Sequence, residues 1–280
     1  MELTKERLVE LKQISTNLRH TILEMIHTAG SGHIGGSLSC VEIITTLYLE
    51  KMNFDPRNPL DPGRDRFILS KGHAVPTLYA MLSYLGLIPR SELLKLRKIG
   101  SILQGHPDMR SVPGIEMSAG PLGLGLSAGI GMALAAQLNK ESYHTYVLLG
   151  DGELQEGIIW EAAMTANKYK LNNLTAILDN NGVQLDGCCE EIMPLGQVAA
   201  KFASFGWQTL TCDGHNIAEL MTAFEKAESY HTGPSIIIAK TVKGKGVSFM
   251  EGKNTWHGRK IEVGDYRQAI AEVGGISYAE

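Results

Sequence analysis

The sequence predicts an α/β fold in which a mostly parallel central sheet carries helices on both faces. Two short, continuous apolar runs, residues 146–149 and 174–178, are typical of strands that are buried on both sides. The segment between them repeats apolar and small residues at helical spacing, at Ile158, Ala162, Thr165, Ala166 and Tyr169. Together these three segments have the length of one parallel strand–helix–strand unit, which indicates the fold class.

Composition and charge limit the classes of protein to consider. The chain has 280 residues, 44% hydrophobic and 20% charged, which suits one large α/β domain spanning residues 1–280. A net charge of −4 gives no sign of a nucleic-acid partner, and no apolar run approaches the roughly 20 residues of a membrane span. The N-terminus lacks a signal-peptide pattern and the four cysteines lack metal-binding spacing, so we expect a cytoplasmic protein.

The first elements follow from amphipathic patterning and from local capping signals. A buried stripe of Leu, Ile and Met predicts a long helix over residues 4–29, which is followed by a glycine-rich loop over residues 31–36. Ser39 and Glu42 have the spacing of a capping box, which predicts a helix over residues 41–48.

The middle of the chain alternates loops with short elements. Residues 53–66 are rich in Pro, Asp and Arg and should form a surface loop, followed by a short strand over residues 67–69. Helices are expected over about residues 77–85 and 91–98, the second of them capped by Ser91.

The remaining elements continue the alternation of helix and strand. The Ala/Gly-rich run over residues 127–138 predicts a helix that can pack very close to a neighbour. After the central unit, helices over residues 198–205 and 217–230 alternate with strands over residues 207–211 and 235–239.

Polar clusters directly follow both central strands, at residues 150–152 and 179–182. Ligands of such units bind beyond the carboxyl ends of the strands, where Asp151 and Asn181 would emerge side by side. Their oxygens, with the carbonyl of Val183, suit Mg²⁺ or Ca²⁺ and leave room for a diphosphate. The glycines allow a close approach of phosphate, and the helix that follows would direct its N–H groups at the anion. Either cluster alone would be an ordinary turn; the pair indicates a site.

Histidines form a second group of candidate residues. His33, His73, His106 and His257 each lie in a glycine-containing loop, and their spacing is not that of zinc ligands. A single loop histidine is usually just solvated, but four in similar contexts suggest acid–base groups around one polar substrate. His257 lies in a polar loop over residues 240–259, which is long enough to be functional or disordered.

These residues give the sequence a resemblance to the N-terminal, diphosphate-binding part of the transketolases, over about residues 20–258. The thiamine diphosphate motif of that family begins with Gly-Asp-Gly and ends with Asn-Asn, as found here at residues 150–152 and 180–181. More specific matches lie at residues 31–33, 69–74, 105–107, 120–123 and 149–157. The resemblance implies a thiamine diphosphate-binding fold of the type that holds the diphosphate.

The resemblance implies a cofactor and a metal. Thiamine diphosphate and Mg²⁺ would bind here, and Ca²⁺ or Mn²⁺ could substitute for magnesium. Asp151, Asn181 and the carbonyl of Val183 would hold the metal. The cofactor contacts that the resemblance implies are His73, Gly120, Pro121, Leu122, Gly150, Asp151, Gly152, Glu153, Asn181, Lys243 and His257.

The resemblance also implies a reaction. The family transfers a two-carbon ketol unit from a ketose or its phosphate to an aldose or its phosphate, as in the pentose phosphate pathway. His33, His106 and His257 would contact the sugar hydroxyls and the reacting carbonyl. Glu156 and Glu161 would lie at a subunit interface and carry a proton relay. The cofactor supplies the electron sink for breaking the carbon–carbon bond, while histidines suit the accompanying proton transfers.

The chain departs from the family in its length. Full-length members are much longer and carry a domain that binds the cofactor's pyrimidine ring, followed by a third domain. We therefore expect either a fragment or one subunit of a split transketolase that is active only with a separate C-terminal subunit. The expected assembly is an α2β2 heterotetramer, in which the helix over residues 127–138 packs closely against a neighbouring chain.

Other functions remain open at this stage. Another enzyme half of the superfamily, similar to 1-deoxyxylulose-5-phosphate synthase or to a 2-oxo acid dehydrogenase E1, would share most of these motifs. Residues 71–73 and 105–107 favour the transketolase side. A split transketolase specialised for an unusual sugar would look similar, and so would a non-catalytic binding protein of this fold, against which the intact metal ligands and histidines argue.

Overall fold

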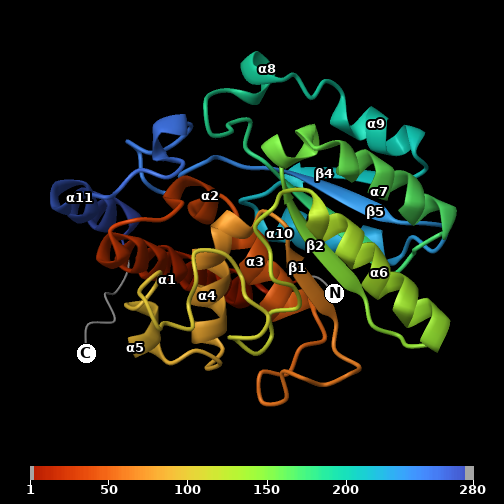
Figure 1. Ribbon diagram of the computed structural model, residues 1–280, viewed down its shortest axis with the longest axis horizontal. Coiled ribbons are helices and arrows are strands. Elements are labelled where there is room, and N and C mark those ends of the chain that lie inside the picture. Colours follow the sequence, from red (N-terminus) through yellow and green to blue (C-terminus); the bar gives the residue numbers. More distant parts are fainter. Residues whose placement is uncertain (1–2, 275–280) are drawn as a thin grey trace.

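The computed structural model describes residues 3–274 of the chain. Within these residues the core is a five-stranded, all-parallel sheet in the order β1-β2-β3-β5-β4 (Figure 1). The strands are β1 (Arg66–Leu69), β2 (Thr145–Gly150), β3 (Leu174–Asn180), β4 (Gln208–Asp213) and β5 (Ser235–Lys240). The parallel sheet and all five predicted strands are confirmed.

Helices cover both faces of the sheet, as predicted, because successive side chains of the central strands point to opposite sides. Tyr146 and Leu148 of β2 belong to one apolar cluster, whereas Val147 and Leu149 belong to the other. The first cluster is covered by α1 (Lys5–Ala29), α3 (Val41–Thr46), α4 (Val75–Tyr84) and α10 (Ile217–Glu228). The second is covered by α6 (Leu124–Asn139), α7 (Gly157–Lys168) and α9 (Val198–Ser204).

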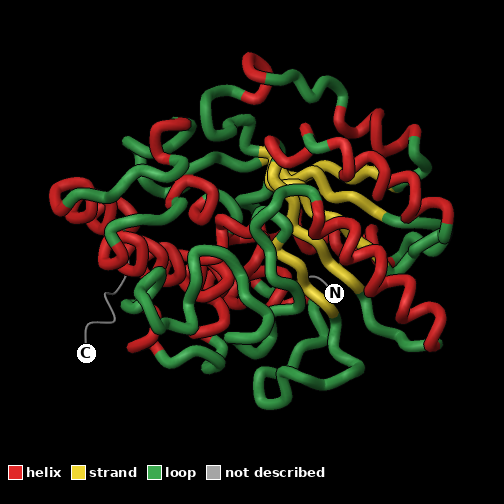
Figure 2. Tube along the Cα trace, viewed as in Figure 1, coloured by secondary structure: helices red, strands yellow, loops and turns green. Residues whose placement is uncertain are grey.

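The shorter helices lie in the connections. They are α2 (Ile34–Leu38), α5 (Arg90–Leu93), α8 (Cys189–Ile192) and α11 (Val263–Val273), with single turns η1 (Leu47–Lys51), η2 (Gly72–Ala74), η3 (Gly152–Gln155) and η4 (Asn254–Trp256). Residues 94–123 contain neither helix nor strand and run as a long loop, drawn in green in Figure 2. In the described part of the chain no helix is long and apolar enough to cross a membrane.

The predicted capping box is wrong. Cys40 is the N-cap of α3 and makes no side-chain capping bond. The hydroxyl of Ser39 donates instead to the Gly36 carbonyl and to Asp179, and Glu42 pairs with Arg19. All these side chains are buried, so tertiary partners replace the local capping bonds.

Helix boundaries and faces also differ from expectation. The helix predicted over residues 91–98 with Ser91 as cap is instead α5, which begins after Pro89 and ends at Leu93. The helix α11 was not predicted; a capping box of Glu262 and Asp265 starts it. The loop over residues 31–36 already contains the beginning of α2.

The helix of the central unit has a different buried face from the predicted one. It buries Ile159, Ala162, Ala163 and Ala166, whereas Thr165 and Tyr169 are exposed. The turn η3 separates Asp151 from the start of this helix at Gly157, so Asp151 accepts from the N–H groups of Gly152 in η3 and of Gly182 after β3, and not from those of the helix.

Candidate cofactor and substrate site

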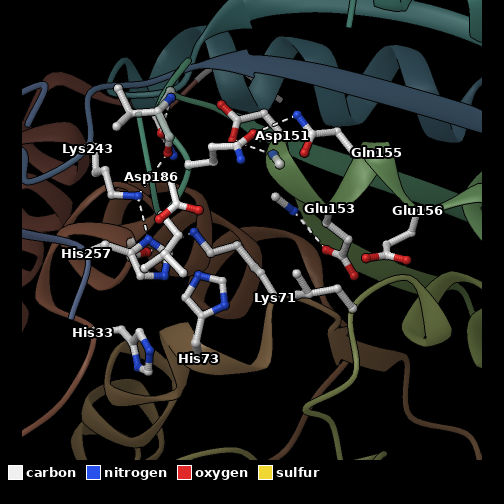
Figure 3. A pocket seen from close by; sticks show the side chains of 18 of the residues that line it. His33, Lys71, His73, Asp151, Glu153, Gln155, Glu156, Asp186, Lys243 and His257 are labelled. Atoms are coloured by element: carbon white, nitrogen blue, oxygen red, sulfur yellow. Dashed lines mark hydrogen bonds between the residues drawn. The ribbon is translucent and has the colours of Figure 1, made fainter. Parts of the chain in front are cut away.

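A cavity of about 390 Å³ opens at the carboxyl ends of β2 and β3. The register of these two strands pairs Gly150 with Asp179, so the two predicted polar clusters are adjacent. Figure 3 shows His33, His73 and His257 close together, with Asp151 at the other end of the cavity. The predicted site residues that line it are His33, His73, His106, Gly120, Leu122, Gly150, Asp151, Gly152, Glu153, Glu156, Asn181, Val183, Lys243 and His257.

Two predicted residues lie outside the cavity wall. Pro121 is exposed beside Gly120 and Leu122, and Glu161 is exposed on α7, beyond the lining residue Glu156. Glu161 therefore does not contact the cavity within this chain, and its part in a relay stays a prediction.

The three predicted metal ligands lie on two neighbouring turns. Asp151 is 3% exposed and accepts hydrogen bonds from the backbone N–H groups of Gly152 (2.8 Å) and Gly182 (2.5 Å). The side-chain oxygen of Asn181 accepts from Val183 N–H at 3.1 Å. Burial and the nearby charge of Asp179 raise the pKa of Asp151, so a cation here would stabilise its charged form.

The donor set at this end is one of hard oxygens. Within the described part of the chain, no group of three or more His, Cys, Asp or Glu side chains could hold a metal ion. A metal at Asp151 would therefore need the amide oxygen of Asn181, a backbone carbonyl and oxygens from a ligand. That combination suits Mg²⁺ and is poor for zinc, so these residues fit the predicted cation.

Lys243 provides a buried cation beside these oxygens. The side chain is 2% exposed, and burial and the charge of Lys71 lower its pKa to about 8. Its ammonium lies 2.9 Å from the Val183 carbonyl and 2.9 Å from Nδ1 of His257. An ammonium has three N–H donors, so one is left for an anion in the cavity.

Close backbone approach completes the cradle for an anion. A Cβ atom at Gly152 would lie 3.1 Å from Cβ of Gln184, and one at Gly36 would lie 3.3 Å from Nε2 of His73. Both glycines line the cavity, so side chains at these positions would narrow it. The buried ammonium, the glycine-lined wall and the oxygen ligands together fit a diphosphate held by a divalent cation.

Four imidazoles from distant loops form the other end of the cavity. The ring centroid of His33 lies 5.2 Å from that of His73, 6.2 Å from that of His106 and 5.3 Å from that of His257. The predicted grouping of the histidines around one space is thus found in the structure. Nδ1 of His33 is buried and has no hydrogen-bond partner among residues 3–274.

Burial keeps these imidazoles neutral. It lowers the pKa of His33 to about 4, with Arg97 adding to the effect, and lowers the pKa of His257 to about 3, with Lys243 adding to it. The pKa of His73 lies well below its usual value, and that of His106 is also lowered, for the same reason. Near neutral pH each ring can therefore donate one hydrogen bond and accept another.

A buried ion pair beneath the cavity was not predicted. The ammonium of Lys71 contacts Asp179 and donates to the Gly36 carbonyl at 2.8 Å, while Asp179 also accepts from the hydroxyls of Ser39 and Thr241. Burial opposes both charges, but Lys71 lowers the pKa of Asp179 and Asp179 raises that of Lys71. The pair ties the end of β3 to the loops that carry His33 and His73.

Glu153, predicted to contact the cofactor, is engaged by the protein itself. Its buried carboxylate accepts from the Ser70 hydroxyl, from Gly123 N–H at 2.7 Å and from Gly150 N–H at 3.0 Å. It therefore joins the end of β1 to the two glycine-containing turns of the cavity. Burial raises its pKa.

Several lining residues were missed by the sequence analysis. They are Gly36, Lys71, Gln155, Gln184, Leu185 and Asp186. Lys71 lies within the block of residues 69–74, which was noted as a family match without any role for the lysine. Residues 184–186 directly follow Val183, so their place in the chain was the available signal.

Comparisons with known proteins agree with this geometry. Residues 10–276 match the family described as transketolase, thiamine diphosphate binding domain. The chain is 45% identical over 255 residues to an apulose-4-phosphate transketolase subunit of Phocaeicola vulgatus, covering 91% of this chain and 90% of that one. It is 44% identical over 268 residues to 6-deoxy-6-sulfo-D-fructose transketolase subunit SqwG of a Clostridium species, covering 96% and 98%.

Longer transketolases match over only part of their length. Human transketolase is 40% identical over 270 residues, which is 96% of this chain and 43% of that protein. The crystal structure of transketolase with sedoheptulose-7-phosphate from Pichia stipitis superimposes with a TM-score of 0.90 at 34% identity, covering 95% of this chain and 41% of that one. The chain therefore belongs to the transketolase family and corresponds to its N-terminal, thiamine diphosphate-binding section.

Proposed function

We propose that this chain is the diphosphate-binding subunit of a two-subunit transketolase. The enzyme would transfer a two-carbon ketol unit from a ketose or its phosphate to an aldose or its phosphate. The observation that carries the proposal is that hard-oxygen ligands, a buried ammonium and four neutral imidazoles line one cavity. The names of two relatives of similar length, both called transketolase subunits, support a division of the enzyme between two chains.

At one end of the cavity, Asp151, Asn181 and the carbonyl of Val183 would hold Mg²⁺, for which Ca²⁺ or Mn²⁺ could substitute. The ammonium of Lys243 would hold the diphosphate against Gly152, while His73, Gly120 and Leu122 would lie along the thiazole side. Thiamine diphosphate, when bound, supplies the carbon nucleophile and the electron sink for breaking and forming carbon–carbon bonds.

At the other end, His33, His106 and His257 would bind the sugar hydroxyls and the reacting carbonyl oxygen. The ammonium of Lys243 has only donors, so Nδ1 of His257 accepts and the ring proton of His257 lies on Nε2. His257 is thereby fixed as a donor at Nε2. His33 and His106, being neutral, can take a proton from a hydroxyl or return one.

The outer face of α6 and α7 supports an assembly with other chains. The helices α6 and α7 lie side by side (Figure 1), and α6 carries no charged residue. Leu138 on α6 is 74% exposed and Met164 on α7 is 53% exposed. Burying this face would remove apolar surface from water. We place Glu156 and Glu161, on the same side, at that interface, and infer an α2β2 heterotetramer with a separate C-terminal subunit.

The identity of the sugar is a further part of the proposal. Relatives of similar length are named for apulose-4-phosphate and for 6-deoxy-6-sulfo-D-fructose, which favours a specialised sugar beside the pentose phosphates. The family match favours a transketolase over a 1-deoxyxylulose-5-phosphate synthase or a 2-oxo acid dehydrogenase half.

The four cysteines are free thiols, which suits a reducing compartment such as the cytoplasm.

The test is a two-carbon transfer assay with this chain alone, with the chain encoded beside it and with the mixture, each with and without thiamine diphosphate and Mg²⁺. We expect turnover only in the complete mixture, in the range of about 1–10³ s⁻¹ that enzymes commonly reach. Turnover at such a rate by the pure single chain would overturn the division into subunits. A mixture that binds cofactor without turning over any ketose would overturn the catalytic role.

A further inference from the structure

The backbone on both sides of Lys243 is held by side chains from distant parts of the chain. The N–H of Val242 donates to Nε2 of His215 at 2.9 Å, and the carbonyl of Lys245 accepts from Nε of Arg19 at 3.0 Å. Arg19 lies on α1 and His215 in the turn between β4 and α10. Neither Arg19 nor His215 is among the described residues that line the cavity, whereas Lys243 is.

Glu42 joins the two holding residues. Its carboxylate accepts from both terminal nitrogens of Arg19, at 2.6 and 2.8 Å, and from Nδ1 of His215 at 2.9 Å. Because the Val242 N–H needs an acceptor, Nε2 of His215 is unprotonated and Nδ1 carries the proton given to Glu42. Burial opposes the charge of Glu42, but Arg19 and His215 outweigh it and lower the pKa of Glu42 to about 2. The carboxylate thus stays ionised and keeps both partners oriented.

The segment between the two held points is tight. Gly244 has a φ of 78°, and a Cβ atom there would lie 2.7 Å from the Met250 carbonyl oxygen, so the turn requires glycine. The N–H of Gly244 donates to the Gly35 carbonyl at 3.0 Å. These contacts fix the backbone of Lys243, so its side chain extends into the cavity to the Val183 carbonyl and to His257.

We propose that Arg19, Glu42 and His215 form a positioning clamp that holds Lys243 in place for an anion in the cavity. The inference rests on the proposed function, because it takes Lys243 as the residue that holds the diphosphate. The clamp residues are positioning residues, since they act through the loop and touch neither cofactor nor substrate. A lysine on a mobile loop would have to be ordered at each binding event, which weakens binding.

Two substitutions of His215 separate the clamp from a general packing role. In His215→Gln the side-chain oxygen can reach the position of Nε2 and still accept from Val242 N–H. In His215→Asn the shorter amide stays near Nδ1 and Glu42, and Val242 loses its acceptor. We expect His215→Asn to weaken thiamine diphosphate binding in the presence of Mg²⁺ by about 10–100-fold, as for other supporting residues, and His215→Gln to weaken it less.

The measurements use this full-length chain together with its partner subunit. Calorimetry gives the dissociation constant of thiamine diphosphate, and hydrogen exchange read by mass spectrometry reports on residues 241–246. His215→Asn should accelerate exchange in that segment. The matched control is His231→Asn, the same substitution at an exposed histidine in the loop before β5, which should change neither readout.

A double-mutant cycle decides whether the clamp acts through Lys243. If it does, His215→Asn should cause little further loss of affinity in a Lys243→Met background. Fully additive losses, or unchanged exchange in residues 241–246, would overturn the inference. A third outcome is that Lys243→Met alone leaves cofactor affinity unchanged while His215→Asn still accelerates exchange in residues 241–246. The contact between Lys243 and the cofactor would then be wrong, and the clamp would have no role in cofactor binding. Should a His215 variant fail to fold, Arg19→Gln tests the other arm with the same readouts.

Discussion

The two ends of the cavity are built in different ways. At the metal end, Asp151 and Asn181 lie on turns directly after β2 and β3, which are paired in register from Thr145 and Leu174 onward. At the histidine end, the rings come from four separate segments, the last of them directly after η4, and adjacent centroids lie 5.1–6.2 Å apart. The backbone hydrogen bonds of the sheet fix the first end, whereas side-chain packing of loops fixes the second.

This difference predicts that the two ends of the cavity have different roles. The metal end offers fixed charges and backbone groups, which suit binding of a polyanion. The histidine end offers neutral rings whose state depends on burial and on nearby cations such as Lys243. Substitutions at the first end should therefore change cofactor affinity, and substitutions at the second should change turnover and its pH dependence.

The largest effect is expected at the metal end, for Asp151→Ala. It removes the charged ligand of the proposed metal site, so Mg²⁺-dependent affinity for thiamine diphosphate should fall by more than the roughly 100-fold upper range for supporting residues. Calorimetry on the assembled enzyme measures this change. The control is Glu191→Ala, an exposed carboxylate on α8 that does not line the cavity, which should have little effect. Unchanged affinity in Asp151→Ala would show that the metal site is misassigned.

The next effect is expected at the histidine end, for His106→Ala. Because we assign His106 to the substrate, kcat should fall by about 10²–10⁴-fold, the usual contribution of a general acid or base, while cofactor affinity changes little. Steady-state kinetics at saturating cofactor, together with calorimetry, separate the two quantities. The exposed His231→Ala serves as control. A variant that loses cofactor but keeps its turnover would move His106 to the metal end.

The smallest effect is expected in the pH dependence of kcat. The pKa of His33 is lowered to about 4 and that of His257 to about 3, so both rings stay neutral until the pH falls through those values. We therefore expect these two rings to reduce kcat only below about pH 5, and not near the ordinary histidine pKa of about 6.5. A pH profile of kcat checks this, and a loss already centred near pH 6.5 would contradict it.

Arg97 offers a way to sharpen the pH experiment. Its guanidinium adds to burial in lowering the pKa of both His33 and His106. Arg97→Met should move the acidic fall in kcat to higher pH, by a modest amount because Arg97 is exposed and its charge is screened. Lys98→Met, a neighbouring exposed cation, is the control. An unmoved profile in Arg97→Met would mean that burial alone keeps these histidines neutral.

The part of the site that could be predicted is the part that follows local order in the chain. Two apolar runs separated by a helical pattern require a parallel pair, and a parallel pair requires that the turns at residues 150–152 and 179–182 meet. The motif residues therefore indicated both the family and the position of Asp151 and Asn181. The similar loop contexts of the four histidines indicated that they belong to one site. The distances between their rings could not be predicted from the sequence.

Tertiary structure alone decided the buried charges and what they hold. Ser39 and Glu42 have the spacing of a capping box, yet in the fold Ser39 bonds to Asp179 while Glu42 joins Arg19 to His215. A local cap contributes only about 1 kcal/mol, whereas a buried carboxylate left without its partners would cost several times that amount. Sequence spacing determined which strands pair and where their turns meet. A buried charged side chain needs partners, and here those partners lie far away in the sequence. The fold alone therefore determined which residues support the site.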